Sequence, residues 1–120
     1  MERIRFIDHQ GERLLLVDCS ACNPKQVAEL SDKLAKFLDP EPDASVLLLA
    51  DFTDAHFTRE TVERIKVAAV YNRKHLKRSA WVFNGNLSKT LHEAVQAFSR
   101  RRIPQFETRE EAMKFLVSGS

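Results

Sequence analysis

The residues best suited to chemistry lie in one stretch, positions 50 to 60, with the sequence ADFTDAHFTRE. It follows the aliphatic run Val46 to Ala50 and contains two aspartates, two threonines and one histidine. Such a stretch, directly after a buried strand, has two interpretations. Its side chains bind a small anion, a nucleotide or a partner protein, or they bond loop amides and cap the next helix.

The first interpretation makes binding candidates of the polar residues that follow two predicted strands. These are Asp51, Thr53, Asp54, His56, Thr58, Asn84 and Asn86. A solvated histidine titrates near neutrality, so His56 is the candidate sensor of a bound ligand. In the second interpretation Thr58 caps a helix while Asp51 and Asp54 satisfy loop amides. Both interpretations stay open at this point.

A C-x-x-C motif, Cys19 to Cys22, supports a rival hypothesis of thiol redox activity. The motif directly precedes a predicted helix N-terminus, where the helix dipole lowers the pKa of a thiol. However, a thioredoxin fold has a helix between its first two strands, whereas here only a tight turn separates them. The alternative is a pair of reduced thiols. No second C-x-x-C motif occurs and the histidines are scattered, so we expect no metal site and no cofactor.

The usual enzyme signatures are absent from the sequence. It has no Gly-rich phosphate loop, no nucleophile elbow and no paired carboxylates on one helix face, so we expect a non-catalytic protein. A net charge of +2 and a pI near 8.7 are too mild to predict nucleic-acid binding. Basic residues cluster at 73–78 and 100–102, where two helices are expected to end. Helix C-termini attract cations, but an acidic partner or a peripheral membrane surface is the alternative.

The chain length and composition predict one domain. With 120 residues, 43% of them hydrophobic, the chain can bury a core without staples. We assign residues 1–117 to the domain and residues 118–120 to a loose tail. The apolar runs are too short to cross a bilayer and no signal-peptide core follows the N-terminus, so we expect a cytoplasmic protein.

The hydrophobic pattern predicts alternating strands and helices. Strands are expected at 4–7, 14–17, 46–49, 80–83 and 103–106, with Gln10 and Gly11 as a hairpin turn. Helices are expected to start after Asn23, at Thr58, near Asn86 and after Thr108, the second one running into the basic cluster 73–78. The order ββαβαβαβα indicates an α/β fold: a mostly parallel sheet of about five strands with an antiparallel first edge strand and four helices. Ligands bind outside the carboxyl ends of such strands, which here means segments 18–23, 51–58, 84–88 and 107–108.

This order of elements, together with the stretches VLLLADFTDAHF and IPQFETREEAMKFL, resembles the STAS domains of bacterial anti-sigma factor antagonists, the SpoIIAA-like group. The resemblance covers nearly the whole chain, which looks more like the divergent STAS/SEC14-like branch of uncharacterised small bacterial proteins than like the sporulation regulators themselves. It implies a non-catalytic regulatory module that binds a partner protein or small ligand, with homodimers expected by analogy. The distant similarity to lipid-carrying SEC14 domains implies, as an alternative, a carrier of an apolar, lipid-like ligand.

The resemblance also bears on phosphorylation. Signalling STAS domains carry Asp-x-Ser at the end of the third strand and then Asp-Ser-x-Gly, whose serine is phosphorylated. Asp51 and Thr53 fit the first part, but the second part falls on residues 59–62 and lacks its aspartate, serine and glycine. Thr58 and Thr61 are the nearby candidate acceptors, and a phosphate there would meet free helix amides.

Overall fold

The computed structural model describes residues 2–119, except for the side chains of residues 86–88. Its elements follow the expected order. They are β1 (Ile4–His9), β2 (Glu12–Asp18), α1 (Pro24–Leu38), β3 (Val46–Asp51), α2 (Arg59–Asn72), the short 3₁₀ helix η1 (Arg73–His75), β4 (Leu76–Val82), α3 (Asn86–Ser99), β5 (Gln105–Phe106) and α4 (Arg109–Ser118).

The strands form one mixed sheet in the order β1-β2-β3-β4-β5. β1 pairs antiparallel with β2 and every other pair is parallel, which confirms the predicted fold class. Gln10 and Gly11 both have positive φ, 51° and 81°, as a two-residue hairpin turn requires. Because β3 and β4 are parallel with Asp51 opposite Val82, the segments that follow them leave the sheet at the same edge.

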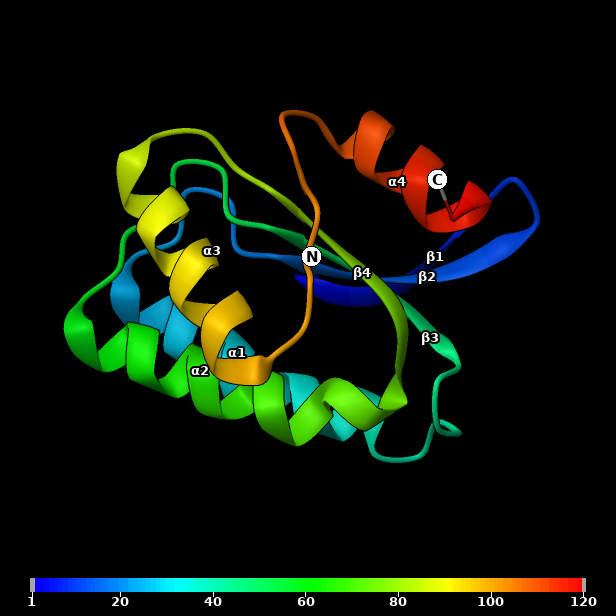
Figure 1. Ribbon diagram of the computed structural model, residues 1–120, viewed down its shortest axis with the longest axis horizontal. Coiled ribbons are helices and arrows are strands. Elements are labelled where there is room, and N and C mark those ends of the chain that lie inside the picture. The colour runs from blue at the N-terminus through cyan, green and yellow to red at the C-terminus, as the bar shows by residue number, and fades with distance from the viewer. Residues whose placement is uncertain (1, 120) are drawn as a thin grey trace.

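Helices cover both faces of the sheet, so the molecule has three layers (Figure 1). α1, α2 and α3 lie on one face, and α4 lies on the other. In the central strands, alternate residues enter two separate apolar clusters: Leu15 and Leu48 face α1–α3, whereas Leu14 and Leu47 face α4. Burial on both faces explains why these strands are apolar at every position.

The helices start where local side chains satisfy their free amides. Asn23 and Gln26 form a complete capping box at α1. Thr58 and Thr61 exchange equivalent bonds at α2, and Thr108 accepts from the Glu111 amide at α4. These starts confirm the predicted helix boundaries at Asn23, Thr58 and Thr108.

The structure differs from prediction where α2 ends. We expected the helix to run into the cluster 73–78 and the strand to start at Ala80; instead α2 ends at Asn72 and β4 starts at Leu76. The reason is tertiary: Leu76 and Ser79 are buried in the sheet, and Arg78 reaches Leu116 O at the end of α4. At the C-terminus, α4 includes Ser118, and Gly119 caps it with φ +77°, so these two residues are not a loose tail. Within residues 2–119, no helix is long and apolar enough to span a membrane.

Candidate functional site

The polar residues of the expected rim lie at the carboxyl ends of the strands, and two of its segments are joined by backbone bonds. The Cys19 amide donates to Asp51 O at 2.8 Å, and the Ala21 amide donates to Thr53 O at 2.8 Å. Asn84 follows β4 at the same edge and is exposed. The side chain of Asn86 lies outside the described residues. The fold therefore brings residues 18–23 and 51–58 together, as the sequence predicted.

The carboxylates of this rim bind to another part of the same chain. Arg109, at the start of α4, donates from Nε to Asp51 Oδ2 at 2.6 Å and from Nη2 to Asp18 Oδ1 at 3.0 Å. Asp51 is buried, and its Oδ1 accepts from the Thr53 amide at 2.9 Å. The three charged residues thus form one network, which ties α4 to the ends of β2 and β3. The sequence analysis missed Arg109, because 58 residues separate it from Asp51.

The network also changes proton affinities. Burial opposes ionisation of Asp18, but hydrogen bonds from Ser20 and the charge of Arg109 outweigh it, so the pKa of Asp18 is lowered. Burial likewise disfavours the charged form of Arg109, yet the two carboxylates raise its pKa. Both shifts favour the charged forms of Asp18 and Arg109, which is what a stabilising ion pair requires.

The remaining rim candidates divide by exposure. Thr58 is exposed and caps α2, whereas Thr61 is buried against the Thr58 hydroxyl at 2.9 Å. A kinase could reach Thr58 more readily than Thr61. Asp54 and His56 are exposed on the connecting loop, and Asp54 adopts a positive φ of 56°. Thr58 and Thr61 also line a pocket between the starts of α1 and α2, whose other polar residues include Lys25, Glu29 and Arg64.

The two cysteines lie inside the protein rather than at a reactive surface. Cys19 is 2% exposed and Cys22 is fully buried. Burial is the largest effect on both thiols, and it raises the pKa of Cys19 and that of Cys22. This direction is opposite to the lowered pKa that we expected from the helix dipole, because burial from water penalises the thiolate more. No group of three or more possible metal-ligating side chains occurs within the described residues.

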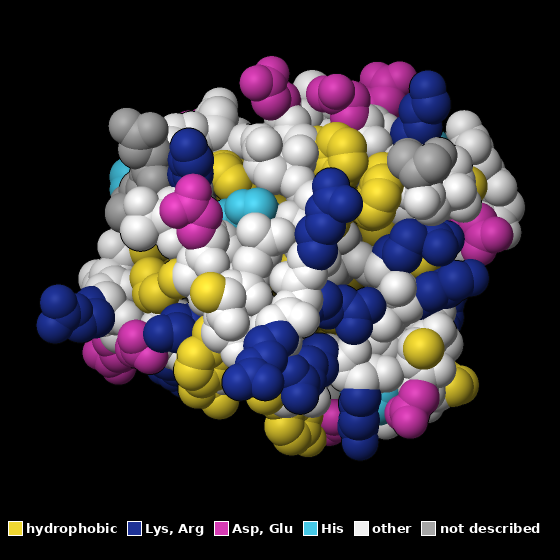
Figure 2. All heavy atoms as spheres, in the orientation of Figure 1, with side chains coloured by type: hydrophobic (Ala, Val, Ile, Leu, Met, Phe, Trp, Pro, Cys, Tyr) yellow, Lys and Arg dark blue, Asp and Glu magenta, His cyan; other side chains and the backbone are white. Residues whose placement is uncertain are grey.

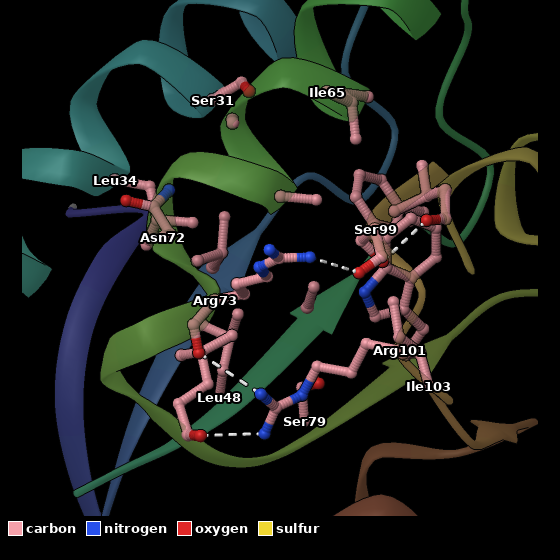
Figure 3. A pocket seen from close by; sticks show the side chains of 18 of the residues that line it. Ser31, Leu34, Leu48, Ile65, Asn72, Arg73, Ser79, Ser99, Arg101 and Ile103 are labelled. Atoms are coloured by element: carbon pink, nitrogen blue, oxygen red, sulfur yellow. Dashed lines mark hydrogen bonds between the residues drawn. The ribbon is translucent and has the colours of Figure 1, made fainter. Parts of the chain in front are cut away.

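A cavity lies elsewhere, between the sheet and the three helices α1, α2 and α3 (Figure 3). Water-sized molecules have about 80 Å³ of space in it, within about 690 Å³ of empty space that includes the part open to solvent. Its walls are mainly apolar: Leu48 and Trp81 come from the sheet, Leu34 from α1, Ile65 from α2 and Val95 from α3. An apolar cavity of this kind favours an apolar ligand over an ionic one.

Two polar atoms in the cavity wall have no hydrogen-bond partner among the described residues. They are Oδ1 of Asn72, at the end of α2, and Oγ of Ser79, in β4. These residues are 2% and 5% exposed. An unsatisfied buried polar atom costs about 1–3 kcal/mol, so each needs a reason. A ligand with a hydroxyl or another polar group would satisfy them.

The C-terminal ends of α2 and α3 are fastened together beside this cavity by two arginines that also line it. Arg73 donates from Nη1 to Ser99 O at 2.9 Å, and Arg101 donates from Nη1 to Arg73 O at 3.2 Å. Figure 3 shows both guanidinium groups with these bonds. The bonds confirm that cations here satisfy helix C-terminal carbonyls.

The sequence analysis did not select Asn72 or Ser79, although each interrupts an apolar pattern. Asn72 continues the helical series Ile65, Ala69, and Ser79 precedes Trp81 by two positions on the same face of β4. A polar residue at a position that the pattern predicts to be buried was therefore the sequence signal that could have identified these two residues as candidates.

Comparisons with known proteins support the fold. The structure is similar to the crystal structure of an uncharacterized protein of the DUF3478 family, with a SpoIIAA-like fold, from Shewanella loihica PV-4. The TM-score is 0.69 at 17% identity, covering 94% of this chain and 91% of that chain. No family model and no curated protein matches the sequence. The chain therefore has a SpoIIAA-like fold, as its resemblance to STAS domains implied.

Proposed function

We propose that this protein is a non-catalytic binding module that holds a small, mainly apolar ligand in the cavity between the sheet and α1–α3. The observation that carries the proposal is the pair of unpartnered buried atoms, Asn72 Oδ1 and Ser79 Oγ, in an otherwise apolar wall. The ligand we infer has an aliphatic body and at least one hydrogen-bonding group.

The cavity supports ligand binding better than the rim does. At the rim, Asp51, Asp18 and Arg109 satisfy one another, and the Thr58 hydroxyl caps α2. In the cavity, two polar atoms lack partners among the described residues, and apolar side chains border empty space. Binding of a partner protein at the rim, through the exposed Asp54, His56 and Asn84, stays a prediction.

The space of about 80 Å³ limits what the closed form can hold. An apolar cavity of about 150 Å³ binds benzene. Longer ligands therefore require the helices to separate, and the bonds between Arg73, Ser99 and Arg101 are the ones to open.

The sole tryptophan, Trp81, lines the cavity and reports binding directly. We expect its fluorescence to change saturably on titration with 1-butanol, 1-hexanol and 1-octanol. Burial of each added CH₂ contributes about 0.8 kcal/mol, which is about fourfold in affinity. The gain per CH₂ should be smaller for the longer alcohols, because the helices must separate to admit them.

The matched variants are Ala69→Leu, which fills the cavity from α2, and Ala35→Leu, on α1 outside it. Ala69→Leu should weaken 1-hexanol binding about tenfold or more, because the leucine side chain occupies space that the alkyl chain needs. Ala35→Leu should leave the affinity unchanged. A non-saturable response, or equal binding by both variants, would show that the alcohols bind elsewhere.

A further inference from the structure

A second hollow, distinct from the apolar cavity, lies where β4 starts and where α3 and α4 end. We call this second space the basic hollow. It is lined by Phe106, Phe115 and Gly119 and by four cationic side chains, which are Lys77, Arg78, Arg101 and Arg102. Its volume is about 650 Å³, within the range of small-molecule sites. Figure 2 shows Lys and Arg side chains gathered near the C-terminal end of α3.

The charge of the basic hollow is not balanced by acids within it, although Lys77 also borders a separate pocket that Glu12 lines. No Asp or Glu lines it, and among the described residues none of its four cations forms an ion pair. The C-termini of α3 and α4 supply about half a negative charge each, so an excess of about three positive charges is left. Like charges held this close repel each other, and a bound anion would relieve the repulsion.

Two of the four cations are already oriented by the backbone. Arg78 donates from Nε to Leu116 O at 3.0 Å, and Arg101 donates from Nη2 to Leu76 O at 2.7 Å. An arginine has five N–H donors. Arg101 also donates to Arg73 O and Lys77 O, so it keeps two donors for a ligand, and Arg78 keeps four. Fixed guanidinium groups lose less side-chain entropy on binding and match the oxygen geometry of phosphate.

Gly119 contributes space beside this site. A Cβ atom at position 119 would lie 3.2 Å from Nη1 of Arg78, and the φ of +77° favours glycine there. The fold therefore holds Arg78 and Arg101 in the wall of the basic hollow, whereas Lys77 and Arg102 are exposed side chains that line it.

We propose that the basic hollow binds the phosphoryl group of a ligand. The excess charge favours a dianion over a carboxylate, and paired arginines favour oxygens that accept two N–H groups. The phosphoryl group belongs either to a free phosphate compound or to the head of an amphiphile. Ser79 and Arg101 line both the basic hollow and the apolar cavity, so one amphiphile can reach both.

The test is calorimetric titration of the whole protein with sodium pyrophosphate and with n-octyl phosphate, at constant ionic strength, with acetate as the reference anion. Both phosphates should bind, and acetate should not. The double variant Lys77→Gln/Arg102→Gln removes two exposed cations that no described contact uses. It should weaken phosphate binding about tenfold, because each partly exposed ion pair contributes modestly.

The matched control is Lys25→Gln/Arg59→Gln, which removes the same charge at the N-termini of α1 and α2. It should change the affinity for phosphate by less than about twofold, because salt screens the interaction of distant exposed charges with the ligand. Equal affinity for the two phosphates assigns the site to free phosphate compounds. Tighter octyl phosphate binding that Ala69→Leu also weakens assigns it to an amphiphile head.

Other outcomes overturn the inference. These are binding of neither phosphate, binding of acetate as tightly as pyrophosphate, or equal weakening by the control variant. The proposed function is judged separately by 1-octanol, which has no charge. Octanol binding without phosphate binding would leave the cavity proposal standing and remove only this one.

Discussion

At the scale of single residues, the most informative atoms are Asn72 Oδ1 and Ser79 Oγ. Folding removed them from water without giving either a partner among the described residues. A second buried serine in the same cavity wall, Ser99, offers a contrast, because its hydroxyl donates to Val95 O at 2.7 Å. Comparing the two serines therefore separates two effects on stability: the cost of the unpartnered Ser79 hydroxyl, which is free for a ligand, and the benefit of the bonded Ser99 hydroxyl.

We expect Ser79→Ala to leave the free energy of unfolding unchanged or to raise it by about 1 kcal/mol, because it removes an unsatisfied hydroxyl. Ser99→Ala should lower it by a similar amount, since it removes a bond. Urea denaturation measures both changes. Ser79→Ala should also weaken 1-hexanol binding in the Trp81 assay. If both serine variants are destabilised equally, Ser79 has a partner and the cavity lacks its polar anchor.

At the scale of elements, the network of Asp18, Asp51 and Arg109 attaches α4 to the sheet. Apart from this network, α4 contacts its face of the sheet mainly through apolar residues such as Ala112 and Leu116. Apolar contact is not directional, whereas the bonds from Arg109 specify where α4 starts relative to β2 and β3.

Arg109→Gln should lower the free energy of unfolding by about 2 kcal/mol, because it leaves the buried Asp51 carboxylate without its cation. Exposed Arg59→Gln, the control, should change it by less than about 0.5 kcal/mol. Adding Asp51→Asn to Arg109→Gln should recover part of the loss. Failure of the double variant to recover any stability would show that the network is not energetically coupled.

The same network predicts a dependence on pH. The folded-state pKa of Asp18 lies below its usual value of 3.8, so its stabilising contribution is complete above that pH. It is lost as the pH falls below 3.8 towards the folded-state pKa. The free energy of unfolding of the parent protein should therefore fall more steeply with acid than that of Arg109→Gln. Parallel acid profiles would contradict this sign.

How far the sequence predicts these elements depends on whether their signals are local. The hairpin turn and the helix caps have local causes, and Gln10, Asn23, Thr58 and Thr108 were assigned correctly. The doubly buried strands leave a local signal too, because their central residues are apolar at every position. The start of β4 is set by contacts with β3 and α4, so the basic residues before Ala80 misled the prediction. Arg109 likewise meets Asp51 only through the tertiary fold.

At the scale of the whole molecule, the three regions lie in different places. The charged network lies at the carboxyl ends of the strands, the apolar cavity under α1–α3, and the basic hollow where β4 starts. Strand order predicted that segments 18–23 and 51–58 lie at this edge, but not that Arg109 pairs with their carboxylates. The sequence could not predict the cavity, because the empty space depends on how side chains from three strands of the sheet and from three helices pack against one another.

The central claim is that the cavity between the sheet and α1–α3 holds an apolar ligand. The most direct measurement is a crystal structure of the protein with 1-hexanol. We predict an ordered alkyl chain between Trp81 and Ile65, with its hydroxyl within hydrogen-bond distance of Ser79 Oγ or Asn72 Oδ1. A cavity that contains only water, or an alcohol bound at the Asp51–Thr58 loop instead, would contradict the claim.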